Sequence, residues 1–285
     1  MTTPAATTPL TDLWFDKGFR VPLYLTAEQD AILRANAQYT HFKRLGCPVC
    51  RGAGSHVWRG EVLPCPDDSF GHAAERLINW YWVHNIPFQY QRLDFAEWPT
   101  DATDTKLNAW EDAQGYLAAF DDLQLDGAGV TIFSPELGTG KTWLATAIQK
   151  ELAKRGVDTW FMPFNEVVSL YQEEDRWTKR MLRGRIQGSA VLVLDEVKLG
   201  GSADQRRLYR EKLEELIRPR TDANLATIVT TNLTDEELEE HYGRVFSLLS
   251  RVNELISLEG EPDAREGLLD EIKRRARLGE RPPIT

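Results

Sequence analysis

Over the C-terminal two thirds of the chain, short apolar runs alternate with longer segments in which apolar residues recur at helical spacing. The short runs are rich in β-branched residues and predict strands, whereas the longer segments predict helices. The predicted strands are 129–133, 159–162, 190–194 and 226–230. The predicted helices are 110–120, 143–155, 165–186 and 205–217. This alternation predicts an α/β fold in which helices cover both faces of a parallel sheet.

The N-terminal third of the chain has a different pattern. Residues 1–12 are rich in threonine, proline and alanine and predict a disordered tail. Helices are predicted at 26–42 and 72–84, and the aromatic residues of the second helix are assigned to packing. Residues 99–108 are polar and rich in turn formers, which is typical of a connector. We therefore divide the chain into a tail at 1–12, a small helical module at 13–84, a linker and adenine-side segment at 85–108, and a larger domain at 109–285.

The first predicted strand leads through a glycine-rich turn into a helix, which is the order that a phosphate-binding loop (P-loop) requires. This loop ends in Gly138-Thr139-Gly140-Lys141-Thr142. Backbone N–H groups of such a turn point at phosphates, Lys141 reaches the β and γ phosphates, and Thr142 coordinates magnesium. The sequence therefore predicts binding of ATP with Mg²⁺, although Pro135 stands where the consensus loop has its first glycine.

Two carboxylates follow the aliphatic strand at 190–194. A strand of this composition is buried in a parallel sheet, and it delivers Asp195 and Glu196 at its C-terminal end. We expect Asp195 to hold magnesium and Glu196 to orient and deprotonate the attacking water. Asn232 follows the next predicted strand and is a candidate for positioning that water, although an asparagine at this place is more often a turn residue.

Composition fits a soluble globular protein, because 42% of the 285 residues are hydrophobic and no run is long enough to cross a bilayer. The formal net charge of −10 argues against indiscriminate binding of nucleic acid over the whole surface. All 3 cysteines lie between residues 47 and 65, which argues against a secreted disulfide scaffold and makes the cytoplasm the expected compartment.

The cysteine segment predicts a zinc site, because a C-P-x-C turn aims two thiolates at one tetrahedral ion. The candidate thiolate ligands are Cys47, Cys50 and Cys65. Zinc needs a fourth ligand, for which His72 is chemically the best candidate and Asp67 and His56 are alternatives. The segment has too little apolar content to order itself, so we expect structural zinc rather than free thiols.

A run of basic residues around one tryptophan interrupts the acidic chain. Its members are Arg176, Trp177, Lys179, Arg180, Arg183 and Arg185. Phosphate neutralisation combined with aromatic stacking is what binding of a single strand needs. Charge runs are usually solvated helix faces, so the residues alone leave both interpretations open.

The order of these motifs resembles that of the AAA+ ATPases, and more narrowly that of the DnaC-type helicase loaders and the IstB-type transposition ATPases. The resemblance covers roughly residues 85–278. Its markers outside the P-loop and the acidic pair are Asn85-Ile86-Pro87-Phe88-Gln89-Tyr90, Leu216-Ile217-Arg218, Thr230-Thr231-Asn232, Leu258-Glu259-Gly260 and Asp263-Ala264-Arg265. In the last marker, Ala264 stands where the family usually has an aromatic residue.

The resemblance implies roles for residues that carry no clear chemistry by themselves. Asn232 maps to the sensor-1 position, and Arg251 maps to an arginine finger that acts on the γ-phosphate held by a neighbouring subunit. Arg244 is a second candidate finger, for which a surface salt bridge is an equally open interpretation. Arg265 matches a sensor-2-like position. A site shared between subunits implies a homo-oligomer.

By resemblance, the expected function is that of an ATP-dependent loader. Such a protein places a hexameric replicative helicase on single-stranded DNA, in a bacterial or phage-infected cell. The zinc module would then contact the helicase, and the basic run would face DNA. The alternative is an IstB-like transposition helper that acts on duplex DNA and a transposase. A small-molecule kinase and an adaptor without hydrolysis are disfavoured, because Lys141, Asp195 and Glu196 are all present and Glu196 suits activation of water.

Overall fold

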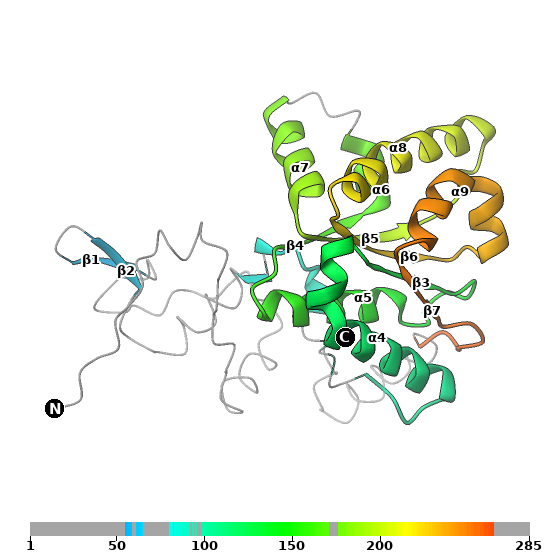
Figure 1. Ribbon diagram of the computed structural model, residues 1–285, viewed down its shortest axis with the longest axis horizontal. Helices are drawn as coiled ribbons and strands as arrows, with labels where there is room; N and C mark the ends of the chain where they lie inside the picture. The colour runs from blue at the N-terminus through cyan, green and yellow to red at the C-terminus, as the bar shows by residue number, and fades with distance from the viewer. Residues whose placement is uncertain are drawn as a thin grey trace, which may run out of the picture.

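A computed structural model of the chain describes residues 55–58, 61–64, 80–81, 83–91, 93, 95, 98–170 and 176–264 (Figure 1). The predicted helix at 26–42 lies outside these residues, as does most of the predicted helix at 72–84. The described part of the N-terminal module contains two antiparallel strands, β1 (Ser55–Trp58) and β2 (Glu61–Pro64). These strands were not predicted from the sequence.

A parallel sheet forms the centre of the larger domain, as predicted, and it has five strands rather than the four predicted. Its strands are β3 (Val130–Phe133), β4 (Thr159–Pro163), β5 (Val191–Val197), β6 (Ala226–Thr231) and β7 (Glu254–Ser257). They lie in the order β4-β5-β6-β3-β7, and every neighbouring pair is parallel. The C-terminal ends of β5, β6 and β3 therefore meet at one edge, with β6 between the other two.

Helices cover both faces of the sheet (Figure 1). They are α4 (Asp104–Leu123), α5 (Lys141–Lys154), α6 (Phe164–Leu170), α7 (Arg176–Gly188), α8 (Ala203–Asp222) and α9 (Asp235–Ser250), with short 3-10 turns η2 (Phe88–Tyr90) and η4 (Gln124–Asp126). One core packs α4 and α5 against the sheet, and the other packs α6 to α9 against the opposite face. Successive residues of β5 alternate between the cores, because strand side chains point to opposite faces: Val191 and Val193 join the first, Leu192 and Leu194 the second.

Three elements differ from the sequence expectation. The helix α4 begins at Asp104, inside the stretch interpreted as a connector. Its first turns are largely solvent-exposed and therefore polar, so their sequence resembles that of a loop. The single helix predicted at 165–186 is two helices, α6 and α7, of which α7 buries only Ile186. The helix α9 and the strand β7 were missed, although Thr234 and Glu237 form a capping box at the start of α9.

A buried arginine cross-links the elements at the N-terminal ends of strands β5 and β6. Arg220 of α8 has no exposed surface and donates to the backbone oxygens of Ile186 at 2.8 Å and Ser189 at 3.0 Å. Its Nε donates to Thr227 Oγ1 at 3.0 Å, at the start of β6. One side chain thus joins the ends of α7, α8 and β6. Among the described helices, none is both long and apolar enough to cross a membrane.

Candidate nucleotide site

The P-loop joins the end of β3 to the start of α5. Its backbone enters the left-handed region at Gly138, with φ 70°, and at Gly140, with φ 104°, which caps α5. Glycine adopts these angles without the strain that a side chain brings. Because the left-handed turns fall at residues 138 and 140, Pro135 occupies a position of the loop that does not need a glycine.

Lys141 lies inside the loop as the sequence predicted. The residue is 8% exposed, and its Nζ donates to the carbonyl oxygens of Ser134 at 3.0 Å and Glu136 at 2.6 Å. It also lies 3.3 Å from Thr139 Oγ1. The ammonium group and the N-terminal N–H groups of α5 therefore face the same loop, which concentrates positive potential where a phosphate chain would bind.

The predicted magnesium ligands come together across two elements. Thr142 Oγ1, in the first turn of α5, donates to Asp195 Oδ1 of β5 at 2.8 Å. Thr230 Oγ1 of β6 donates to the same carboxylate oxygen at 2.6 Å. Burial raises the pKa of Asp195, and the hydrogen bonds from Thr230 and Thr142 oppose that shift. Hydroxyl and carboxylate oxygens are the hard ligands that Mg²⁺ prefers, so this donor pair fits the ion.

Glu196 leaves the sheet at the same edge. It is the one exposed residue of β5, with a left-handed φ of 57°, and the pairing of β5 with β6 shifts register between Leu194 and Val197. Its backbone N–H donates to Thr230 Oγ1 at 2.9 Å. A positive φ at a residue that is not glycine is strained, and such strain is concentrated at functional sites. Burial chiefly, and the charge of Glu196 in addition, raises the pKa of Asp195, so the exposed Glu196 lies near the buried carboxylate.

Asn232 follows β6 directly and is half-buried. Because β6 lies between β3 and β5, this residue is placed between the ends of the P-loop strand and the acidic strand, as expected for a residue that positions water. The neighbouring backbone is held by Thr231 Oγ1, which donates to the Val197 carbonyl at 2.7 Å.

Two residues at this site were not assigned a role from the sequence. Thr230 joins the carboxylate of Asp195 to the backbone of Glu196. Tyr90 lies near Thr142, and burial together with the charges of Asp195 and Glu196 raises the pKa of Tyr90. The motif at 85–90 indicated relatedness but no role for its tyrosine, and a threonine inside a strand resembles any β-branched residue.

The candidate arginines differ in their surroundings. Arg251 is exposed at the C-terminal end of α9, and among the described residues it forms no ion pair. Arg244 lies 3.4 Å from Glu214 of α8, so for this residue the surface salt bridge is observed. Arg265 lies outside the described residues. The geometry therefore favours Arg251 over Arg244 as a group available to a second subunit.

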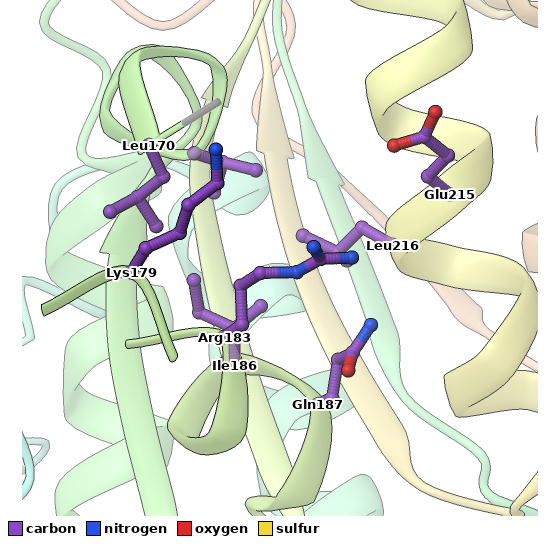
Figure 2. Close-up of a pocket in the computed structure, with 8 residues that line it drawn as sticks. Leu170, Lys179, Arg183, Ile186, Gln187, Glu215 and Leu216 are labelled. Atoms are coloured by element: carbon purple, nitrogen blue, oxygen red, sulfur yellow. The ribbon is translucent and has the colours of Figure 1, made fainter. Parts of the chain in front are cut away.

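The basic run forms α7 and splits into three sets. Trp177 and Met181, one helical turn apart, are 69% and 50% exposed. Lys179 and Arg183 line a surface pocket with an apolar floor that includes Leu170, Ile186 and Leu216, and Glu215 lies on its far side (Figure 2).

Arg185, one helical turn after Met181, forms the third set and is engaged within the fold. It pairs with Asp158 at 2.9 Å and lies over the ring of Trp160. Because it is engaged within the fold, we regard it as the weakest of the predicted nucleic-acid contacts. Arg176 and Arg180 are exposed beside Trp177 and Met181.

The predicted zinc ligands Cys47, Cys50, Cys65, His72 and Asp67 lie outside the described residues. Within the part of the chain that the structure describes, no three metal-binding side chains of the histidine, cysteine or carboxylate type come together. The zinc site stays a prediction from the sequence.

Comparison with known proteins agrees with this geometry. Residues 125–248 match the family described as IstB-like ATP binding protein. The core has an α/β P-loop fold of the AAA+ type. A primosome component from Streptococcus pyogenes serotype M3 has a TM-score of 0.50 and 19% identity, over 62% of this chain and 91% of that chain.

Two further solved structures are similar at slightly lower scores. The DnaC helicase loader is 25% identical, with a TM-score of 0.47 over 54% of this chain and 90% of that chain. DnaI is 22% identical, with a TM-score of 0.49 over 60% of this chain and 94% of that chain. No curated protein matches the sequence. The predicted α/β class and the AAA+ resemblance are thus confirmed.

Proposed function

We propose that this protein hydrolyses ATP. The observation that carries the proposal is the contact of the Thr142 hydroxyl with the Asp195 carboxylate, beside the exposed carboxylate of Glu196. These are the two oxygen ligands and the base that water attack on a γ-phosphate requires. Magnesium, when bound, neutralises charge that develops between the β and γ phosphates. Lys141 and the P-loop N–H groups bind the phosphate oxygens.

Each remaining group has one task in the proposed reaction. Glu196 takes the proton of the attacking water, and Asn232 orients that water from the end of the adjacent strand. Arg251 of one subunit reaches the γ-phosphate on its neighbour and stabilises charge in the transition state. Hydrolysis then depends on assembly, because no single chain supplies the complete site.

The trans role of Arg251 is tested by mixing two variants. Arg251→Ala and Glu196→Gln should each lose steady-state hydrolysis, the second while still binding ATP. An equimolar mixture should recover a fraction of the parent rate, because some interfaces then pair an intact Arg251 with an intact Glu196. If the mixture stays as inactive as either variant alone, Arg251 does not act between subunits.

We further propose that ATP turnover loads a hexameric replicative helicase onto single-stranded DNA. The order of motifs from residue 85 onward, which resembles that of helicase loaders, supports this function. The exposed Trp177 on α7, flanked by Arg176 and Arg180, supports contact with single strands, since stacking and phosphate neutralisation are both available. Cys47, Cys50, Cys65 and His72, or Asp67 in place of His72, would hold zinc in the module that docks the helicase.

Binding to labelled oligothymidine tests the DNA contact. Trp177→Ala combined with Arg180→Ala should weaken binding about tenfold or more, because one stacked base alone contributes about 1–3 kcal/mol. Arg207→Ala is the matched control: it removes an exposed α8 arginine that pairs with Glu211 at 2.9 Å, and it should leave binding unchanged. Equal effects of both variants would show that only net charge matters and would remove α7 as a specific contact.

The match to the IstB-like family supports a second candidate function, that of a transposition helper that acts on duplex DNA. Competition between single-stranded and duplex DNA of equal length separates the two. A loader should prefer the single strand and associate with a hexameric helicase, whereas preference for duplex and capture of a transposase would establish the helper function.

A further inference from the structure

A second lysine contacts the P-loop from outside the motif. Lys106, in the first turns of α4, is buried, and its Nζ donates to the carbonyl oxygen of Thr139. The ammonium also lies 3.9 Å from a carboxylate oxygen of Glu261, whose side chain is 3% exposed. The second oxygen of that carboxylate accepts a hydrogen bond from Thr103, the N-cap of α4. A buried ion pair thus connects α4, the loop and the segment after β7.

The contact of Lys106 decides the direction of one peptide group in the loop. In a trans peptide the C=O and the following N–H point in opposite directions. Because the Thr139 carbonyl points to Lys106, the N–H of Gly140 points away from α4. One residue earlier, the Gly138 carbonyl accepts a hydrogen bond from Ala264 N at 3.0 Å, so the N–H of Thr139 points away from the C-terminal segment.

Both glycines of the loop are closely packed against residues outside the motif. A Cβ on Gly140 would lie 3.1 Å from the ring of Trp98, whose indole N–H donates to the Lys106 carbonyl at 2.9 Å. A Cβ on Gly138 would lie 1.7 Å from a carboxylate oxygen of Asp263. Contacts on both sides of the loop therefore orient the peptide groups that carry the N–H groups of Thr139 and Gly140, and successive N–H groups of such a turn can form an anion-binding concavity.

A contribution to stability does not explain why a lysine and a glutamate are buried at this place. Replacing a buried ion pair by apolar residues of similar volume is often neutral or stabilising. Burial lowers the pKa of Lys106, which the charge of Glu261 opposes. An apolar contact in place of the Lys106–Glu261 pair would therefore pack equally well. What an apolar side chain could not do is donate a hydrogen bond to the Thr139 carbonyl, as the ammonium group of Lys106 does.

We propose that Lys106, held by Glu261, is a positioning residue that fixes the P-loop N–H groups of Thr139 and Gly140 toward the phosphates of ATP. This proposal rests on the ATP site proposed above. The positioned N–H groups bind the phosphates equally in the ground state and the transition state. Losing them should therefore raise KM and leave kcat nearly unchanged.

The test measures the equilibrium Kd of a fluorescent ATP analogue with magnesium, the KM and kcat for ATP, and the urea midpoint of unfolding, all on the full chain. Lys106→Met removes the donor but leaves Glu261 without its charge partner. Lys106→Met combined with Glu261→Gln removes that charge while keeping an acceptor for Thr103. Lys106→Arg restores a cationic donor. Lys154→Met removes an exposed α5 lysine that pairs with Glu151 at 2.7 Å and is the control.

We expect Lys106→Met to weaken the Kd about tenfold or more, the scale of a lost hydrogen bond from a charged group. The double variant should recover the urea midpoint but keep the weak Kd and the raised KM. Lys106→Arg should recover part of the affinity. A double variant that regains both stability and affinity would reduce Lys106 to a packing role and overturn the proposal. Absence of nucleotide binding in the parent protein would instead refute the ATP site itself.

Discussion

Thr230 of β6 contacts both Asp195 and Glu196, so Thr230→Val tests specifically what this contact contributes. Valine has nearly the shape of threonine but lacks the hydroxyl, so the substitution removes two hydrogen bonds without opening a large cavity. One is the 2.6 Å bond to the Asp195 carboxylate, and the other is the 2.9 Å bond from the backbone N–H of Glu196. A bond to a charged group contributes about 1.5–3 kcal/mol and a neutral one about 1 kcal/mol, which sums to about 2.5–4 kcal/mol.

Two assays should register the loss. The free energy of unfolding in urea should fall by about 2.5–4 kcal/mol when nucleotide is absent. The kcat for ATP should fall at least about tenfold, because Glu196 loses the bond that holds its strained backbone and a small misplacement of a reacting group is costly. Without the donation from Thr230, the pKa of Asp195 should rise further, so the acidic limb of the kcat/KM profile should move to higher pH.

Thr227→Val is the matched control on the same strand. It removes the acceptor of Arg220 Nε, at 3.0 Å, and should lower stability by a comparable about 1.5–3 kcal/mol. It lies at the other end of β6 and should leave the pH profile unchanged. If Thr230→Val keeps the parent's pH profile, or if Thr227→Val shifts that profile equally, the assignment of Thr230 to the acidic pair is refuted.

Three further predictions concern the loop, the buried carboxylate and the buried arginine. Gly138→Ala should weaken binding of a fluorescent ATP analogue at least about tenfold, because a Cβ there meets Asp263 and φ is 70°; an unchanged Kd would contradict the loop geometry. Burial raises the pKa of Asp195 in the folded state above its value in the unfolded state, which is about 4. Below about pH 4 the carboxyl group is protonated in both states and costs no stability, whereas ionising it at higher pH destabilises the fold. As pH rises from about 4 to the folded-state pKa of Asp195, the urea midpoint of the nucleotide-free protein should therefore fall relative to that of Asp195→Asn. Arg220→Met should lower the free energy of unfolding by about 3–5 kcal/mol, because it leaves buried carbonyl groups without a hydrogen-bond donor. A loss below about 1 kcal/mol would show that water replaces the side chain.

The sequence by itself identified the main residues of the candidate nucleotide site. Lys141 and Thr142 follow a glycine turn at the start of a helix, and Asp195 and Glu196 follow an aliphatic strand. Both motifs are local, so their spacing is visible along the chain. Parallel strands also place their C-terminal ends at one edge of a sheet, and the contact of Thr142 with Asp195 confirms that expectation although 53 residues separate them.

Only the tertiary structure decided which polar side chains support that site. Thr230 acts on a carboxylate 35 residues away, and Lys106 contacts a carbonyl 33 residues away. Thr103 meets Glu261 across 158 residues. A threonine in a strand and a lysine in the first turns of a helix carry no pattern that distinguishes them from solvated or packing residues. Their partners are selected by strand order and by the docking of α4 and the segment after β7, which arise from packing of two separate cores rather than from local spacing.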